Sequence, residues 1–346
     1  MRLLIHSANA FSGMRSFQRG IMLASLILGL PKVFIYGKDH PTKIFRFYED
    51  NDFLNIRGNG TDKAYTNGVR LDLFYNAKDT NRNFVQRLLP VAGAGSVNIY
   101  GWSLMQVMVT PKNLTIPTFQ KDDYPYSGSL FISHSMASYN PSAKRMVQSE
   151  VVLGIRGPAS FARQTQVGIH RLINDEIPMG WKNQCDSKVL ININCTTEKL
   201  FHHFRKCLEI IGGATISAGT MCNSVAVYPL LRFGLMNPYF EGLFAQFGNG
   251  QAGDTKKKKV QCYLIAKPKV TFVATNSIMS GDIHTTLIPK QDHQVSKVNH
   301  YVAEINFGLV ITRGNAGISY TQKPTTAYNK GLYGHNVGNI SLYFNW

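Results

Sequence analysis

An imidazole and a carboxylate fall close together on one short stretch of the chain, where they could act as acid–base catalysts. In segment 154–178, Gln166, His170 and Asn174 recur every four residues, so a helix would place them on one polar face. Glu176 follows His170 by six residues and can point toward the same site. A neutral imidazole, with an ordinary pKa of about 6.5, can take a proton from water. The alternative is a helical plug or lid whose His170 only satisfies local hydrogen bonds.

Two polar clusters elsewhere could hold a metal ion. Glu49-Asp50-Asn51-Asp52 ends an alternating segment, and carboxylate and amide oxygens of this kind bind hard cations. A second cluster, from Asp62 through Thr66 to Gly68, opens the next segment. If the two segments form a hairpin through Gly58-Asn59-Gly60, the clusters lie side by side and their oxygens can converge. Taken alone, an acidic cluster is more often the solvated end of a strand.

The segment that carries His170 is predicted to be a helix over residues 158–176. Pro158 suits a first helical turn, where its missing N–H costs nothing. Pro178 prevents further extension. Between them, apolar or β-branched residues recur at helical intervals of three and four: Phe161, Thr165, Ile169 and Leu172.

The rest of the chain is organised as short alternating segments separated by Gly, Asn and Ser turns. About twelve of them have the length of roughly ten residues that a tilted strand needs to cross a membrane. The expected strands are 43–54, 64–75, 97–109, 126–139, 145–156, 188–196, 200–211, 220–233, 260–275, 298–313, 317–323 and 337–346.

Two ways of closing such strands compete, a soluble sandwich and a transmembrane barrel. A sandwich has one apolar face per strand and Pro/Gly turns. An outer-membrane barrel has aromatic girdles, weak alternation, a polar lumen and an even strand count. The thirty-nine aromatic residues favour the barrel, and so does the final segment, in which Ile340, Leu342, Phe344 and Trp346 alternate with polar or smaller neighbours. We therefore expect an all-β fold, a twelve-stranded antiparallel transmembrane barrel with one short helix in an extracellular loop.

Composition and the N-terminus indicate an exported, basic protein. The formal net charge is +17 although only 16% of residues are charged, against about 25% in soluble proteins. Such a surface faces anions, such as nucleic acid or lipid phosphates; the scattered basic residues disfavour nucleic acid. Arg15 and Arg19 precede the apolar run 21–30, as in an export signal. We expect a signal over residues 1–37 and a single barrel domain over 38–346. The five cysteines show no disulfide or zinc pattern.

Five motifs in one order carry a family resemblance. They are YEDNDF (48–53), D-x-x-YTNG (62–68), DYPYSG (123–128), LGIRGPAS (153–160) with Gln166 and the HRLI of 170–173, and MGWKNQ (179–184). The series resembles the lipid A 3′-O-deacylase family of Gram-negative outer membranes. The similarity runs from about Tyr48 to the C-terminus and is strongest before residue 185.

The resemblance implies a twelve-stranded outer-membrane barrel that hydrolyses the 3′-linked acyl ester of lipid A and needs calcium (Ca2+). Its catalytic positions fall on Asn51, Asp52, Thr66, His170 and Glu176, all of which match. Of these, Asp52, Thr66 and Glu176 are the implied metal ligands. The family's lysine near the oxyanion has no aligned counterpart, and Lys112 is the nearest substitute. The usual Asp-Arg-Pro-Tyr sequence has Tyr124 in place of arginine, which puts that arginine's role in doubt.

The residues are chemically consistent with this activity. Ester hydrolysis needs an activated water and a stabiliser for the oxyanion; the imidazole can supply the first and a cation the second. No GxSxG elbow is present, so a serine nucleophile is not expected. The partners implied are lipid A or lipopolysaccharide and the bacterial outer membrane. The alternative is a non-catalytic outer-membrane barrel, a porin or structural protein.

Overall fold

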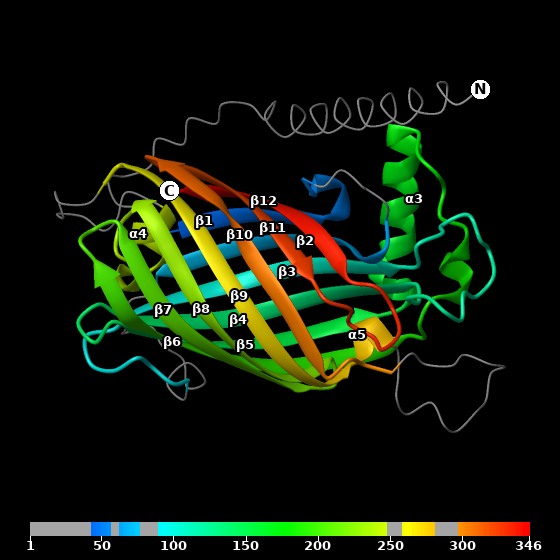
Figure 1. Ribbon diagram of the computed structural model, residues 1–346, viewed down its shortest axis with the longest axis horizontal. Helices are drawn as coiled ribbons and strands as arrows, with labels where there is room; N and C mark the ends of the chain where they lie inside the picture. The colour runs from blue at the N-terminus through cyan, green and yellow to red at the C-terminus, as the bar shows by residue number, and fades with distance from the viewer. Residues whose placement is uncertain (1–42, 57–61, 77–88, 248–257, 281–296) are drawn as a thin grey trace.

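The described residues form one closed antiparallel barrel (Figure 1). The computed structural model describes residues 43–56, 62–76, 89–247, 258–280 and 297–346. The predicted signal and the predicted turn at 58–60 lie outside these residues. Each strand pairs with its sequence neighbours, and the first strand closes the barrel against the last, with Phe45 opposite Phe344. The predicted twelve-stranded antiparallel barrel is confirmed, and the sandwich interpretation is wrong.

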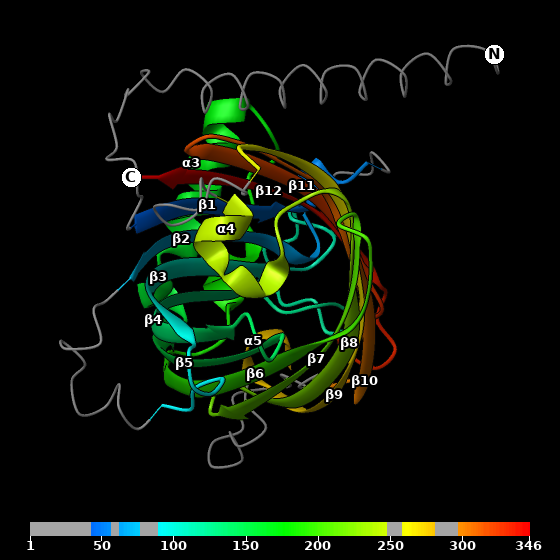
Figure 2. The same cartoon turned by 90° about the vertical axis from the view of Figure 1, so that its left-hand side faces the viewer.

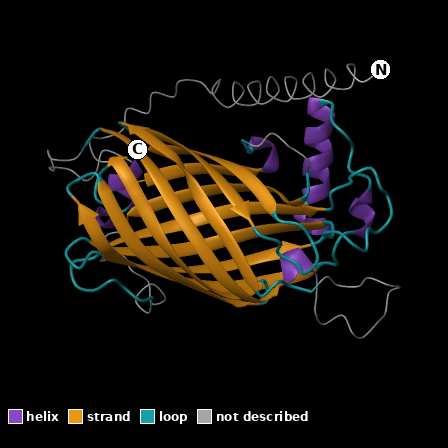
Figure 3. Ribbon diagram, in the orientation of Figure 1, coloured by secondary structure: helices purple, strands orange, loops and turns teal. Residues whose placement is uncertain are grey.

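Twelve strands are present among the described residues (Figure 3). They are β1 (Lys43–Asn51), β2 (Ala64–Asn76), β3 (Val97–Thr110), β4 (Ser127–Asn140), β5 (Arg145–Arg156), β6 (Lys188–Phe204), β7 (Leu208–Gly219), β8 (Cys222–Leu235), β9 (Val260–Asn276), β10 (Tyr301–Arg313), β11 (Ala316–Thr325) and β12 (His335–Asn345).

One predicted strand boundary is clearly wrong. The break expected between residues 196 and 200 is absent, because β6 continues to Phe204. Thr196 and Thr197 are β-branched and favour extended backbone, and the Thr196 hydroxyl lies 2.9 Å from the Thr215 hydroxyl of β7. The chain turns instead at Arg205, which adopts a left-handed φ of 50°.

The barrel wall is apolar outside and polar inside. Along β3, Trp102 and Leu104 are each 48% exposed, whereas Ser103 between them is buried. Inside, the Asp72 carboxylate accepts a hydrogen bond from Arg46 Nε at 2.7 Å. This alternation is typical of a barrel whose outer face contacts lipid and whose lumen is polar.

One end of the barrel is filled by the connection between β8 and β9. This connection contains η5 (Tyr239–Glu241) and α4 (Leu243–Phe247), which lie across the mouth of the barrel (Figure 2). Phe240 and Phe244 are buried in a cluster with lumen-facing residues of several strands. The Phe247 ring stacks on Tyr343 of β12, with centroids 3.8 Å apart. Apolar packing therefore holds these elements inside this end of the barrel.

The other helical elements all belong to the opposite end. They are η1 (Asp52–Leu54), η3 (Pro158–Ser160), α3 (Ala162–Ile173), η4 (Gly180–Asn183) and α5 (Ser277–Ser280). Each lies in a connection from an odd-numbered to an even-numbered strand, and in an antiparallel barrel such connections share one end. The segments that carry His170 and Asp52 are thereby brought to the same end. Among the described residues, no helix has the length and apolar character to cross a membrane.

Candidate active site

The predicted helix 158–176 is shorter than expected and begins after a kink. Residues of η3 form a single 3-10 turn, and Phe161 then adopts a left-handed φ of 59° before α3 starts. Asn174, with a left-handed φ of 54°, ends the helix after Ile173, a conformation that asparagine tolerates better than most residues. Glu176 consequently lies beyond the helix, not in its last turn.

Helix α3 buries its polar face and exposes its apolar face. Gln166 and His170 are buried, whereas Ile169 is 43% and Leu172 is 77% exposed. A surface helix of a soluble protein packs the other way round. Since hydrophobic burial does not explain this orientation, the buried polar side chains are the feature to account for.

The start of α3 is fixed against the barrel wall by close backbone approach. A Cβ atom on Gly128 of β4 would lie 2.3 Å from the Ala162 Cβ and 2.5 Å from the Ser160 Oγ, so only glycine fits here. Trp181 of η4 is buried in the same cluster as Ala162. Gln106 Nε2 of β3 donates to the Ser160 carbonyl at 2.6 Å. These contacts fix the position from which His170 is presented.

The His170 ring is held on both sides by oxygen acceptors. Its Nδ1 lies 2.5 Å from the backbone carbonyl of Glu176, and its Nε2 lies 2.7 Å from Asp62 Oδ2. Burial by itself lowers the pKa of His170, but the hydrogen bond and negative charge of Asp62 outweigh it, so the pKa is raised above 6.5. A carbonyl can only accept, so Nδ1 carries a proton and Nε2 is the nitrogen whose protonation can change.

A second pair of side chains holds Asp62 in place. Gln166 Nε2 donates to Asp62 Oδ2 at 2.7 Å, and Trp181 Nε1 donates to Gln166 Oε1 at 2.7 Å. The series Trp181, Gln166, Asp62 and His170 therefore connects η4, α3 and the start of β2 by side-chain hydrogen bonds. Each contact constrains the next, which orients the imidazole.

Asp52 lies beside this series with one carboxylate oxygen unpaired. The residue is 3% exposed, its Oδ2 accepts the Lys63 backbone N–H at 3.1 Å, and its Oδ1 is buried without a hydrogen-bond partner among the described residues. Burial first, and then the nearby Asp62 carboxylate, raise the pKa of Asp52 well above its ordinary value. A buried carboxylate oxygen with no donor, next to a second negative charge, fits a cation.

The strand pairing brings the predicted residues Asn51 and Thr66 to the same end as Asp52. Asn51 pairs with Asn67 across β1 and β2, so the predicted apposition of the two clusters is confirmed. Asn51 Oδ1 accepts the Phe53 N–H at 2.8 Å and caps η1, which carries Asp52. The Thr66 hydroxyl is buried, 2.6 Å from the Thr110 hydroxyl of β3. No group of three His, Cys, Asp or Glu side chains that could hold a metal ion occurs in the described part of the chain.

The remaining predicted residue, Glu176, contributes its main chain to the site. Its carbonyl contacts the His170 ring, while its side chain is exposed and its N–H is bound by Asp175 Oδ1 at 2.8 Å. The structure thus pairs His170 with Asp62, whose charge also acts on Asp52, and leaves the Glu176 carboxylate at the surface.

Lys112 and Tyr124 can also be placed. Lys112 is exposed, and its backbone N–H donates to Asp123 Oδ2 at 2.9 Å. Tyr124 is fully buried; its hydroxyl donates to the Tyr333 carbonyl and accepts the Tyr328 N–H, each at 3.1 Å. In this chain Tyr124 therefore anchors the connection between β11 and β12 at the site.

Sequence reasoning placed Asp62 only in the second polar cluster, as part of a possible metal site, and did not identify it as the direct partner of His170. It opens the second polar cluster, but it is 108 positions from His170, so no local spacing relates the two residues. Two expectations could have suggested the contact. The expected hairpin placed residue 62 near Asp52, and the polar face of the expected helix carried His170.

Comparisons with known proteins identify a family and agree with the barrel fold. The family model described as "Outer membrane protein LpxR" matches residues 21–346. Among solved structures, LpxR from Salmonella typhimurium is similar with a TM-score of 0.67 at 16% identity, covering 88% of this chain and 100% of that one. An outer membrane channel from Pseudomonas putida F1 has a TM-score of 0.43 at 10% identity, covering 92% and 100% of the two chains. No curated protein matches the sequence.

Proposed function

The chain belongs to the LpxR family of outer membrane proteins, and we propose that it is a calcium-dependent esterase that removes the 3′-linked acyl chain of lipid A. The family match covers residues 21–346, which include every residue of the site. The observation that carries the proposal is the His170–Asp62 pair, 2.7 Å apart, next to the buried and unpaired oxygen of Asp52.

His170 is the proposed general base. Its Nδ1 donates to the Glu176 carbonyl, which leaves the lone pair of Nε2 to accept a proton from water. Asp62 Oδ2 occupies that position in the structure, so the Asp62 oxygen must move aside to admit the water. The hydroxide equivalent attacks the ester carbonyl carbon, and the proton on Nε2 is then returned to the departing sugar oxygen. Asp62 stabilises the imidazolium formed between these two steps.

Asp52 is the proposed charged ligand of the calcium ion, with Thr66 as a neutral oxygen ligand. The unpaired Oδ1 and the excess of negative charge around Asp52 support this assignment. Calcium bound there would supply a Lewis acid for the ester carbonyl. Asn51 positions Asp52 by capping η1. Glu176 orients the His170 ring through its carbonyl; a ligand role for its exposed carboxylate stays a prediction.

The surroundings of the site suit an acyl substrate. Ile56, two residues after η1, is 70% exposed, and Leu172 on the outer face of α3 is 77% exposed. Exposed apolar side chains next to a polar catalytic group are typical of sites that bind lipid chains.

The porin alternative is less well supported. An open porin keeps a water-filled channel, whereas α4 and η5 fill one end of this barrel with buried Phe240 and Phe244. A structural role for the barrel would not need the orphaned Asp52 oxygen. We therefore retain the esterase as the better proposal.

The test is the mass spectrum of lipid A from Gram-negative cells that express the protein, with and without added calcium. We expect loss of the mass of the 3′-linked acyl group, in a calcium-dependent manner. An unchanged acyl pattern in both conditions, with the folded barrel present in the outer membrane, would favour the non-catalytic alternative.

A further inference from the structure

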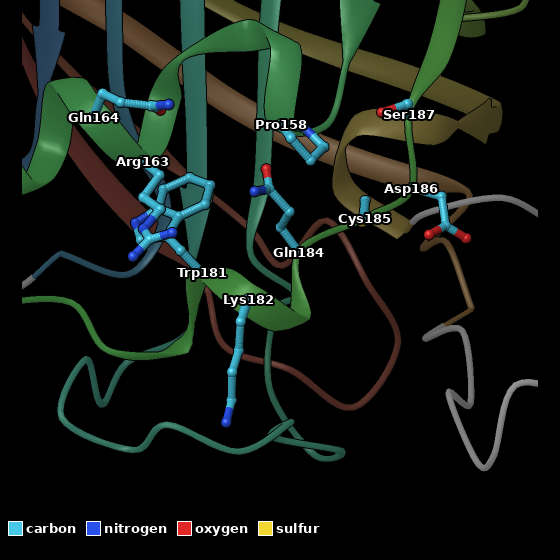
Figure 4. Close-up of a pocket in the computed structure, with 9 residues that line it drawn as sticks. All are labelled: Pro158, Arg163, Gln164, Trp181, Lys182, Gln184, Cys185, Asp186 and Ser187. Atoms are coloured by element: carbon cyan, nitrogen blue, oxygen red, sulfur yellow. The ribbon is translucent and has the colours of Figure 1, made fainter.

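A pocket separate from the His170 site is lined by Trp181, whose indole N–H donates to Gln166. Its volume is about 340 Å³, and it is formed by the start of α3, η4 and the segment that leads into β6 (Figure 4). Trp181 forms one wall and Pro158 another, and the Gln184 side chain extends between them. None of these residues takes part in the proton transfer described above.

The pocket carries positive charge that is not neutralised locally. Arg163 and Lys182 both line it and both are exposed, and neither forms an ion pair with a described residue. Asp186, the acidic residue of the lining, lies at the far side of the pocket from Arg163 (Figure 4). An anion that enters would therefore meet the Arg163 guanidinium first, and the exposed Lys182 side chain, which extends away from the other lining residues, adds positive charge at the edge of the pocket (Figure 4).

A residue of the pocket wall also contains a buried acceptor that lacks a donor. Gln184 Oε1 is buried and has no hydrogen-bond partner among the described residues, and such a group is costly to leave unpaired. A ligand hydroxyl can satisfy it once the Gln184 side chain rotates toward the pocket, and a simple anion cannot. Two cations together with an unpaired amide oxygen fit a ligand that carries both negative charge and hydroxyl groups. An acidic sugar, bearing a carboxylate or a phosphate, has this combination.

The pocket is aligned with the proposed catalytic residue. Arg163 precedes His170 by seven residues, which is about two turns of α3. The two residues therefore lie on nearly the same face of the helix, about 10 Å apart along its axis. Trp181 connects the two places, because it lines the pocket and donates to Gln166, which holds Asp62. A glycolipid whose ester lies at His170 can thus place a polar group of its headgroup in the pocket.

We propose that Arg163, Lys182 and Gln184 form a subsite for an acidic sugar group of the substrate headgroup, which sets the enzyme's preference among lipid A species. The inference rests on the proposed esterase function. It names the part of the substrate that is recognised away from the cleaved ester.

The test compares substrate preference, using the full-length protein in detergent micelles. Three substrates are used: lipid A with sugar acids attached to its headgroup, bisphosphorylated lipid A without them, and lipid A with a single phosphate. We expect a preference, as a ratio of kcat/KM values, of about five- to tenfold for the substrate that bears the recognised group. The double variant Arg163→Gln/Lys182→Gln should bring that ratio close to one.

The matched control is Lys121→Gln, which removes one positive charge from an exposed residue of the β3–β4 connection at the same end of the barrel. It should keep the wild-type ratios. If the double variant no longer distinguishes lipid A with sugar acids from bisphosphorylated lipid A, the sugar carboxylate is the ligand. If it no longer distinguishes bisphosphorylated lipid A from lipid A with a single phosphate, a phosphate is the ligand. Wild-type ratios in the double variant, or equal losses in the control, would overturn the proposal.

A binding measurement separates this proposal from the esterase proposal. If the wild-type protein cleaves none of the substrates, the esterase proposal fails, and the pocket is tested by titrating free galacturonic acid and glucosamine 6-phosphate. The readout is the fluorescence of the protein, to which Trp181 in the pocket wall contributes. A saturable change in the wild type that is absent from the double variant supports the subsite; no change with either sugar rejects it.

Discussion

Two buried acids at opposite ends of the barrel have opposite hydrogen-bond surroundings. Near α4, Glu198 is 4% exposed, and its two carboxylate oxygens accept the hydroxyls of Tyr228 at 2.9 Å and Tyr239 at 2.6 Å. At the other end, Asp52 is 3% exposed, and the hydrogen bonds described for it reach only one of its oxygens. Satisfied acids stabilise a fold, whereas an unsatisfied one costs stability. The difference is consistent with a structural role for Glu198 and a chemical role for Asp52.

The helices at the two ends show the same contrast. Phe244 of α4 is buried among apolar lumen residues, while Leu172 of α3 is exposed and the polar Gln166 and His170 are buried in its place. Helix α4 follows the usual rule of burying apolar side chains. Helix α3 breaks that rule, and a local break of this kind in an otherwise regular fold marks a functional region.

The strongest way to test this comparison is to remove the base. His170→Ala should lower kcat by about 10²–10⁴-fold, the usual contribution of a general base. The barrel should still form, because contacts of Gly128, Ala162 and Trp181 anchor α3 in addition to those of the imidazole. The measurements are deacylation of lipid A in micelles and the heat-modifiable migration of the folded barrel. Loss of activity and of folding together would mean that the α3 end is structural after all.

The two buried acids offer a matched pair of substitutions. Asp52→Asn should reduce the rate by about 10²–10³-fold, as does loss of an oxyanion stabiliser, with partial recovery at high calcium. Glu198→Gln should leave the calcium dependence unchanged and lower barrel stability by about 1–3 kcal/mol, because a tyrosine hydroxyl loses its charged acceptor. Rates measured against calcium concentration distinguish the two variants. Full wild-type activity in excess chelator would contradict the role given to Asp52.

Much of the barrel was predictable because its rules are local. Alternation such as Trp102, Ser103, Leu104 and the aromatic ending at Phe344 and Trp346 depends on neighbouring residues and needs no knowledge of tertiary contacts. The error after Thr196 has the same origin, since nothing in the immediate sequence distinguishes a turn there from a longer strand.

The site was less predictable because its contacts are distant in sequence. The residue types at His170, Asp52 and Thr66 suggested catalysis and metal binding, but the Asp62–His170 ion pair depends on how α3 docks on the barrel end. The helix end at Asn174 also depends on backbone conformation, and it separates the Glu176 carboxylate from the ring while keeping its carbonyl there. A sequence pattern thus identifies candidate site residues more easily than it identifies the atom that each residue contributes to the site.

Stability should respond to α4 and not to the exposed face of α3. Phe244→Ala removes a buried ring and should lower the free energy of unfolding by about 3–5 kcal/mol. Leu172→Ala, at a 77% exposed position, should change it by no more than about 0.5 kcal/mol. Urea unfolding from lipid vesicles, followed by tryptophan fluorescence, measures both variants. Equal losses would mean that Leu172 packs against the body of the protein and that the contrast between the two helices is wrong.

The finest test concerns the pH at which His170 becomes a base. Burial lowers the pKa of His170, but Asp62 raises it above 6.5, and only the neutral ring accepts a proton. Activity at saturating calcium should therefore rise with pH through a midpoint above 6.5. In Asp62→Asn the lowering by burial remains while the charge of Asp62 is lost, so the midpoint should move to lower pH and the plateau should fall because the imidazolium loses its counter-charge. Asp175→Asn removes a weaker charge near His170 and should shift the midpoint less, in the same direction. A midpoint that is unchanged in both variants would mean that a group other than His170 controls the acid side of the profile.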